Sequence, residues 1–193
     1  MNMMKAKHKP EISSWRYILS FIWETSKIVI VSLAIIIPIR YFLFQPFFVR
    51  GASMEPNFKN GEYLIIDELT YRFKEPERGD TIIFKYPKDP SQYYIKRIIG
   101  LPEEMLIISA GEITIFNDSN PNGLVLKEPY LSKENQFTSG DIEIILDEND
   151  YFVLGDNRQV SSDSRIWGAV PEHYIIGRVL IRAWPLDRVG VVD

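Results

Sequence analysis

Residues 93–99 read Tyr-Tyr-Ile-Lys-Arg-Ile-Ile, and short stretches of similar composition, rich in Ile, Val, Tyr and Phe, recur on both sides of them. Such runs, separated by turn-forming residues, are typical of β-strands. Working outward, the expected strands are Tyr63–Asp67, Thr81–Tyr86, Tyr93–Ile99, Met105–Ser109, Glu112–Phe116, Ile142–Leu146, Tyr151–Leu154 and Ile175–Ala183. Because no amphipathic helix longer than two turns is expected after residue 50, the sequence predicts a mostly β, antiparallel body.

The polarity of the chain changes within this body. Residues 102–148 are more polar and richer in loops than the rest, with Asn117–Gly123 as the clearest example. We interpret them as a small β-ribbon insertion. The core then has a first part at residues 46–101 and a second part at residues 149–193.

The composition excludes several kinds of site. The 193 residues contain no cysteine, which rules out disulfides, thiol nucleophiles and Cys-based zinc sites. The two histidines, His8 and His173, are too few for a His-rich metal centre, so neither a metal nor a cofactor is expected. The net charge of −4 does not indicate a nucleic-acid partner.

An apolar segment precedes the β body. The run Ile28–Ile39 carries no charge, and apolar residues resume after Arg40. A bilayer core requires about 20 helical residues, so we expect a transmembrane anchor at residues 26–45, with Arg40 reaching the interface. Residues 1–25 are then a basic cytoplasmic tail, because cations flank a membrane span on its inner side. The upstream cations are Lys5, Lys7, Lys9, Arg16 and Lys27.

Two other interpretations of the apolar segment fit the sequence less well. A cleaved signal peptide has the same basic-then-apolar layout but should end in small residues, whereas residues 40–46 read Arg-Tyr-Phe-Leu-Phe-Gln-Pro. A buried core helix is a poor match for an Ile/Val run behind five cations. An uncleaved anchor is therefore favoured.

Ser53 follows the anchor closely and is a possible nucleophile. A reactive serine needs a base within about 3 Å and donors for the oxyanion. The motif G-x-S-x-G does not apply, since Glu55 replaces its last glycine. His173 could complete a Ser-His-Asp triad, but it lies in a turn-like stretch where a surface histidine is the simpler interpretation.

Lysine is the other available base, and it acts as one only when it is neutral. Lys96 lies in the most apolar expected strand, and a period of two places it on the face of Tyr94 and Ile98. Arg97 takes the opposite face, so one of the two cations should be on the buried side. The pattern does not choose between them, and composition alone favours an ion pair between Lys96 and a carboxylate at a sheet edge.

A third polar segment runs from Gly155 to Gly168 and contains Gly-Asp-Asn-Arg followed by three serines. Asp and Asn bond to their own backbone in turns, so a plain turn is one interpretation. Within the segment, Asp163 and Arg165 could form an ordinary ion pair. Composition alone says little more.

Together these three segments resemble the type I signal peptidases, also called leader peptidases, over Phe44–Pro185. The family's nucleophile motif, Ser-Met-x-Pro, is present as Ser53–Pro56. Its lysine motif, with Arg next and Gly-Leu-Pro shortly after, is present as Lys96–Pro102. Its Gly-Asp-Asn-Arg-x-x-Ser-x-Asp-Ser-Arg block is complete as Gly155–Arg165. Three motifs in order behind an anchor are a specific signal.

The resemblance assigns roles to residues at the matching positions. It makes Ser53 the nucleophile and Lys96 the general base. It also implies a set of supporting positions. These are Ser161, whose hydroxyl would orient Lys96, the ion pair of Asp163 with Arg165, the backbone amides of Ser53 and Gly51 as oxyanion donors, and the substrate-pocket residues Phe47, Val49 and Ile95.

The chain departs from the family pattern at three points. Many relatives have a serine hydroxyl as oxyanion donor where this chain has Gly51, so a backbone amide must replace it. Asn57 stands where threonine often follows the proline. Glu103-Glu104 replaces Gly-Asp, which favours a different turn because Glu tolerates positive φ poorly.

The resemblance also implies a setting. The catalytic core would lie outside the cytoplasm of a single-pass cell-membrane protein whose N-terminus is cytoplasmic. Its partners would be the lipid bilayer, exported preproteins with small residues at the first and third positions before the cut, and the nearby secretion machinery. The alternatives are a catalytically silent, membrane-anchored scaffold and a self-cleaving repressor of the SOS kind, which would need a DNA-binding domain in place of the anchor.

Overall fold

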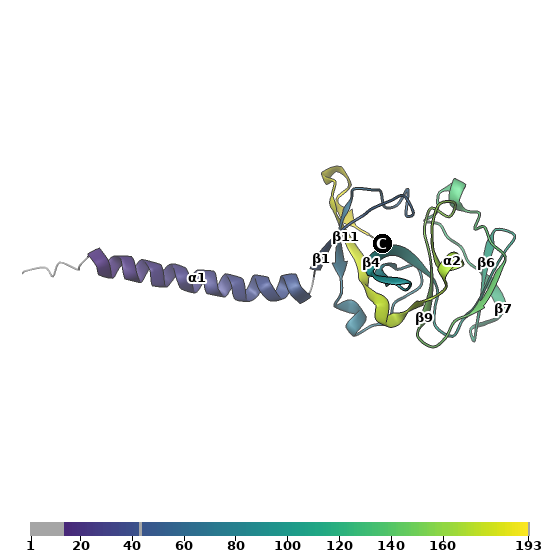
Figure 1. Cartoon of the computed structure of the whole chain (residues 1–193), viewed down its shortest axis with the longest axis horizontal. Coiled ribbons are helices and arrows are strands. Elements are labelled where there is room, and N and C mark those ends of the chain that lie inside the picture. The colour runs from purple at the N-terminus through teal and green to yellow at the C-terminus, as the bar shows by residue number, and fades with distance from the viewer. Residues whose placement is uncertain (1–13, 43, 193) are drawn as a thin grey trace, which may run out of the picture. The chain divides into compact units, whose positions relative to one another are not determined.

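The computed structural model describes residues 14–42 and 44–192, which form an N-terminal helix and a β body (Figure 1). Helix α1 spans Ser14–Phe42. Within it, the 23 residues Trp15–Ile37 include no buried residue and are long and apolar enough to cross a membrane by length and composition. The expectation of one long apolar helix before the β body is confirmed.

Helix α1 begins twelve residues before the expected start of the anchor at residue 26. The expectation followed the uncharged run, but charges do not end a helix. Glu24 and Lys27 pair at 2.8 Å across one turn of α1. At the other end, Pro46 favours an extended conformation at the residue before it, and strand β1 (Phe44–Phe48) follows α1. Residues 1–13 of the expected tail lie outside the described residues.

The β body consists of two antiparallel sheets (Figure 1). The larger has the order β1-β2-β11-β3-β4-β9-β10, with β12 on β11. Its other strands are β2 (Tyr63–Asp67), β3 (Thr81–Tyr86), β4 (Asp89–Gly100), β9 (Asp150–Leu154), β10 (Val170–Pro171), β11 (Ile175–Trp184) and β12 (Gly190–Val191). The smaller sheet has the order β7-β6-β5-β8, formed by β5 (Met105–Ser109), β6 (Glu112–Asn117), β7 (Asn120–Val125) and β8 (Ile142–Ile145).

Helices are short in the β body. Within residues 44–192 the one α-helix is α2, Ser164–Trp167. Single 3-10 turns occur at Thr70–Arg72, Lys133–Asn135, Glu172–Tyr174 and Leu186–Arg188. The predicted class, mostly antiparallel β, is confirmed.

All eight expected strands are present, and four further strands were not expected. These are β1, β7, β10 and β12. The clearest case is β7, whose sequence Asn-Pro-Asn-Gly-Leu-Val looks like a loop. It becomes a strand because the preceding strand supplies a partner, with Thr114 opposite Val125 and Ile115 opposite Leu124. Tertiary pairing here overrides local propensity.

Three apolar clusters hold the body together. One lies beneath the loop that follows β1 and includes Val49, Met54, Phe58, Leu64, Ile66, Ile83, Ile95 and Val179. A second joins the two sheets through Ile99, Leu106, Ile108, Ile113, Ile115, Leu146, Phe152 and Leu154. The third covers the other face of β3 and β4 through Ile82, Phe84, Ile98, Tyr151, Val153, Trp167 and Val170. Strands β3 and β4 are therefore covered on both faces.

The turn between β4 and β5 contains a non-glycine residue with a positive φ. Glu103 has a φ of 64°, a conformation that is uncommon for residues other than glycine. The next residue, Glu104, is buried, pairs with Arg78 and accepts a hydrogen bond from the Leu101 amide at 2.8 Å. The Glu104 contacts explain how the turn is held with glutamates at both positions.

Candidate active site

The loop that carries Ser53 is fixed at both ends. Val49 donates its amide to Glu62 O at 2.9 Å and accepts from the Gly61 amide at 3.0 Å. After Ser53, the side chains of Met54 and Phe58 are almost wholly buried in the first apolar cluster. Ser53 itself is half-buried. The loop therefore presents a hydroxyl at a defined position instead of on a free surface.

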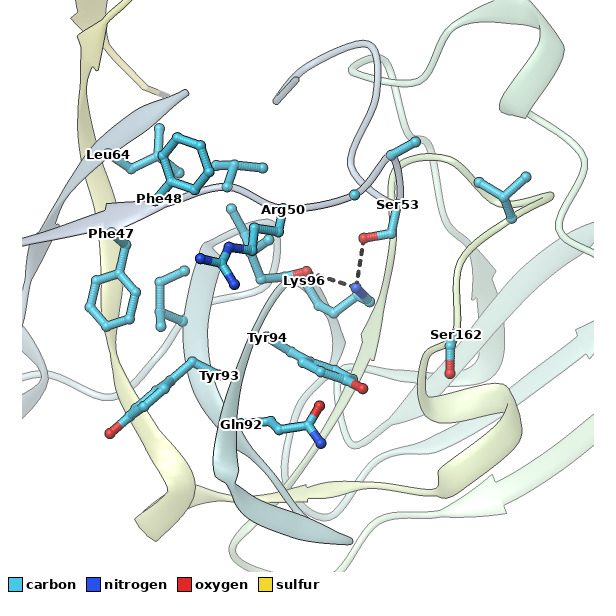
Figure 2. A pocket seen from close by; sticks show the side chains of 16 residues that line it. Phe47, Phe48, Arg50, Ser53, Leu64, Gln92, Tyr93, Tyr94, Lys96 and Ser162 are labelled. Atoms are coloured by element: carbon cyan, nitrogen blue, oxygen red, sulfur yellow. Dashed lines mark hydrogen bonds between the residues drawn. The ribbon is translucent and has the colours of Figure 1, made fainter. Parts of the chain in front are cut away.

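Lys96 extends from β4 to meet Ser53. Its Nζ lies 2.9 Å from Ser53 Oγ and 2.9 Å from the carbonyl oxygen of Ile95 (Figure 2). Only 4% of Lys96 is exposed. Burial lowers the pKa of the Lys96 amine to about 8, although the carboxylates of Asp163 and Asp156 act in the opposite direction. A substantial neutral fraction of the amine is therefore present near pH 8.

Lys96 and Arg97 are both buried, whereas the sequence predicted that only one of the two cations would be on the buried side. Arg97 points to the other face of β4 and forms two hydrogen bonds with Asp156, at 2.9 and 2.7 Å. Its guanidinium lies 4.1 Å from the ring centre of Tyr130. Tyr130 belongs to the expected β-ribbon insertion, so the contact between Arg97 and Tyr130 connects β4 with a segment that is distant in the sequence.

The supporting residues that the resemblance implied lie around Gly155. Asp163 accepts a hydrogen bond from the Gly155 amide at 3.2 Å and pairs with Arg165 at 2.8 Å. A side chain at Gly155 would meet Ser161 Oγ at 2.2 Å and the Ser53 carbonyl at 2.4 Å, so only glycine fits between them. The third segment therefore packs directly against the Ser53 loop.

Ser161 Oγ is buried, and no described residue provides it with a hydrogen-bond partner. A buried polar group without a partner costs free energy, so its presence calls for an explanation such as a function or a bound molecule. The structure thus brings this hydroxyl to the back of the Ser53 loop but records no hydrogen bond from it to Lys96 within residues 44–192.

The amide of Gly51 is engaged in this structure. Gly51 has a φ of 90°, which glycine adopts without strain, and its N–H donates to Asn60 Oδ1 at 3.0 Å. To act as an oxyanion donor, this amide must exchange Asn60 for the substrate.

Several contacts around Ser53 were not foreseen from the sequence. The Asn157 amide donates to the Ser53 carbonyl at 3.0 Å, and its side chain donates to Ala52 O at 3.2 Å. Asn57, noted above only as a departure, donates to Asp156 at 2.7 Å. The sequence signal for these contacts was weak, because polar loop residues usually face solvent.

A cavity of about 680 Å³ opens beside Ser53 and Lys96 (Figure 2). The three predicted pocket residues, Phe47, Val49 and Ile95, all line it, together with Leu64 and Ile83. Ser161, Asp163 and Arg165 do not line it. The dyad therefore lies at the edge of a mainly apolar recess, with the supporting residues behind it.

His173 is separate from this arrangement. It is exposed, lies against Tyr174 and does not line the cavity. Among residues 14–42 and 44–192, no cluster of three or more His, Asp or Glu side chains is arranged to hold a metal. The chemistry that the described residues can provide is that of a serine hydroxyl beside a buried amine.

Comparison with known proteins yields one family. A family model described as "Signal peptidase, peptidase S26" matches residues 22–184. The chain is 33% identical over 193 residues to the Synechocystis sp. protein named "Probable signal peptidase I-2", covering 97% of this chain and 82% of the relative. Identity with signal peptidase IB of Staphylococcus aureus is 29% over 173 residues, covering 81% and 86%.

A crystal structure of a signal peptidase I from Enterococcus faecalis V583 shares 34% identity with the chain. It aligns with a TM-score of 0.45 and covers 54% of this chain and 97% of that one. Since the family model spans most of the sequence and a relative above 30% identity is matched over 82% of its length, this chain belongs to the signal peptidase family, peptidase S26.

Proposed function

We propose that this chain is a membrane-bound endopeptidase that removes signal peptides from exported preproteins, with Ser53 as nucleophile and Lys96 as general base. Signal peptidases act on preproteins that carry signal peptides. The observation that carries the residue assignment is the 2.9 Å separation of Lys96 Nζ and Ser53 Oγ beside an apolar cavity.

The proposed reaction has two stages. The neutral Lys96 amine takes the proton of Ser53 Oγ as that oxygen bonds to the scissile carbonyl carbon. When the tetrahedral intermediate collapses, the C–N bond breaks and Lys96 returns the proton to the leaving amine. A water molecule then attacks the acyl carbon and gives one proton to Lys96. When the bond between Ser53 Oγ and that carbon breaks, Lys96 returns the proton to Ser53 Oγ and the signal peptide leaves with a free carboxylate. The amides of Ser53 and Gly51 would stabilise the oxyanion.

Burial is what suits Lys96 to this task. An ordinary lysine, with a pKa near 10.5, is almost wholly protonated at neutral pH and cannot accept the serine proton. The apolar packing of β4 disfavours the ammonium form. Tyr94 adds to the enclosure, because its ring centre lies 5.5 Å from Lys96 Nζ.

The strands around the cavity offer two free edges to an extended peptide. Strand β1 pairs only with β2 among the described residues. In β4, pairing with β9 begins at Arg97, so Tyr93–Lys96 has β3 on one side and no described strand on the other. An extended substrate can add to such an edge through its main chain. We infer that the residues before the cut bind in this way.

The cavity floor would select small side chains at two substrate positions. Val49 and Ile95 pack in one cluster, and Phe47 lies against Tyr93 with ring centres 5.7 Å apart. Alternate side chains of an extended peptide point to the same face. The first and third residues before the cut would therefore both meet this floor.

The polar segment Gly155–Gly168 would support Ser53 and Lys96 without contacting the substrate. Ser161 would orient the Lys96 amine after a small side-chain rotation, and the Asp163–Arg165 pair would hold the segment in place through the Gly155 amide. These are positioning roles, because none of the three residues lines the cavity.

Helix α1 would anchor the protein in the lipid bilayer, with the N-terminus in the cytoplasm and the β body outside, near the secretion machinery. The length of Trp15–Ile37 supports the span. The cations before Ile28 support the orientation.

The proposed function is tested by incubating the purified full chain, in detergent micelles, with a preprotein and sequencing the new N-terminus. A single cut after a small residue at the signal-peptide boundary is expected, and Ser53→Ala should not make it. An intact preprotein after prolonged incubation with the unmodified chain would favour the silent-scaffold alternative.

A further inference from the structure

The loop before Ser53 places a charged side chain in the cavity that the proposed reaction does not use. Arg50 lines the cavity, and Figure 2 shows its guanidinium turned into the space that Phe47, Tyr94 and Lys96 also border. Its side chain is exposed, and none of the described carboxylates lies within 4.0 Å of it. Its recorded contact is the ring of Phe48, 5.9 Å from Cζ.

Alternation along the chain separates Arg50 from the cavity floor. Val49 is buried, and Phe47 packs against the same cluster. Phe48 is 46% exposed, and Arg50 is exposed next to it. Residues 47 and 49 therefore face the floor, whereas residues 48 and 50 face the open side of the cavity.

A bound extended peptide would alternate in the same way. If its first and third residues before the cut face the floor, its second and fourth face the open side, where Phe48 and Arg50 lie. Arg50 is three residues from Ser53 and Phe48 is five, so Arg50 is the nearer of the two to the scissile bond. The second residue before the cut is thus the one placed beside the guanidinium.

The charge of the cavity lining makes this contact selective. The lining contains no Asp or Glu, and its other basic side chain, Lys96, is buried and hydrogen-bonded to Ser53. Arginine side chains in proteins carry a permanent positive charge. A carboxylate on the substrate would find an unpaired cation, while a lysine at the same place would meet a like charge.

We propose that Arg50 is a specificity-determining residue that favours an acidic side chain, and disfavours a basic one, at the second position before the cut. The inference rests on the proposed function, since it requires a peptide to be cleaved at Ser53. The cavity floor would select small side chains at the first and third positions before the cut. Arg50 would add a charge preference at the second position, which the floor does not contact.

The test uses the full chain in non-ionic detergent and peptides with Ala at the first and third positions and Glu, Gln or Lys at the second. The quantity compared is the ratio of kcat/KM for the Glu peptide to that for the Lys peptide, which cancels any general loss of activity in a variant. The unmodified chain should give a ratio of about threefold or more, the size that exposed charges allow. Arg50→Gln should bring the ratio close to one, and Arg50→Glu should invert it.

Lys59→Gln is the matched control, because Lys59 is exposed in the same loop, carries the same charge and does not line the cavity. Its ratio should equal that of the unmodified chain. Raising the salt concentration from ~0.05 M to ~1 M should shrink the ratio, since screening acts on exposed charges.

The outcomes separate the two proposals. Cleavage of all three peptides with a ratio that Arg50→Glu leaves unchanged would overturn the role of Arg50 and leave the peptidase intact. A preference that appears at the fourth position instead of the second would also overturn it. Failure of the unmodified chain to cut any of the peptides or a preprotein would overturn both proposals.

Discussion

Lys96 and Arg97 are neighbours in β4, point to opposite faces of the strand and are each only 4% exposed. One meets a hydroxyl, Ser53 Oγ, and the other meets a carboxylate, that of Asp156. The paired cation keeps its charge, while the cation without an adjacent carboxylate has its pKa lowered to about 8. A single strand thus holds a fixed charge and a proton acceptor side by side.

Activity should rise with pH as Lys96 loses its proton. Below its pKa of about 8, the neutral fraction falls tenfold for each pH unit, and above it the fraction levels off. A plot of log kcat/KM against pH should therefore have a rising limb of unit slope that bends near pH 8.

Variants at Lys96 test whether this residue is responsible for the rise of kcat/KM with pH. Lys96→Ala should lower kcat/KM by at least ~10²–10⁴-fold, and Lys96→Arg should not restore it, because a guanidinium stays protonated. His173→Ala should retain most of the activity, as the ring is exposed and outside the cavity. If His173→Ala were inactive and Lys96→Ala active, a histidine-based triad would replace the proposed dyad.

Ser161→Ala should reduce activity without reducing stability. Its hydroxyl is buried without a described partner, so removing it relieves a desolvation cost instead of breaking a hydrogen bond. We expect kcat to fall at least about tenfold and the bend in the pH profile to move, as for loss of a group that orients the base. Urea unfolding should give an unchanged or slightly higher free energy.

Ser164→Ala is the contrasting variant. Ser164 Oγ accepts the Val153 amide at 3.0 Å, so its loss leaves a buried donor unsatisfied and should cost about 1–3 kcal/mol. A purely structural Ser161 would show full activity and an unmoved pH profile in Ser161→Ala.

Cleavage should require Ala, Gly or Ser immediately before the cut. Val49, Ile95 and Phe47 leave a shallow floor, and overfilling a packed site costs ~1–3 kcal/mol, equivalent to about 5- to 150-fold in rate. Peptides with Ala or Phe at that position should be compared by kcat/KM. Equal cutting of the two would show that these residues do not form the first pocket.

The Arg97–Asp156 pair should contribute far more to stability than an exposed pair. Arg97→Gln leaves the buried carboxylate of Asp156 without its cation and should cost about 3–5 kcal/mol. Arg178→Gln makes the same change at a 3.5 Å pair whose arginine is 33% exposed, and should cost less than about 1 kcal/mol. Equal effects in urea titrations of the two variants would contradict this ranking.

The β body should be accessible from outside the cell. Protease added to cells stripped of their wall should digest it while leaving a cytoplasmic marker intact, because the cations before Ile28 favour an inner N-terminus. Complete protection of the β body until the membrane is dissolved would reverse the proposed orientation.

The sequence predicted most of the fold because the strand signal is local. Runs rich in Ile, Val, Tyr and Phe between turn residues predicted strands such as Thr81–Tyr86 with the observed bounds. The strand at Asn120–Val125 was not visible, since its pairing with β6 outweighs its turn-like composition. The anchor predicted at residues 26–45 was derived from the uncharged run and made no prediction of where the helix begins; α1 continues N-terminally through Glu24 and Arg16.

The site was less accessible to sequence reasoning for a different reason. The proximity of Ser53 to Lys96, 43 positions apart, and of Asn57 to Asp156, 99 positions apart, is set by the fold and not by any pattern near either residue. Burial of both Lys96 and Arg97 could not be deduced from alternation, which says that two neighbours point to opposite faces but not whether both faces are covered. Elementary chemistry made Ser53 and Lys96 candidates, the motif resemblance assigned their roles, and those roles stay predictions.

The contacts of Arg158 determine where this protein can change in length. Arg158, in the Gly155–Arg165 block, bonds to Glu128 and Thr138, and Tyr130 lies over the guanidinium of Arg97. Residues 128–138 are therefore tied at several points to the segments that support Ser53 and Lys96. The far hairpin, between β6 and β7, has no such tie to the dyad within the described chain. Loops of different size could be grafted at Asp118–Ser119 without loosening the Ser53 loop, whereas one residue added between Glu128 and Tyr130 would shift Tyr130 off Arg97.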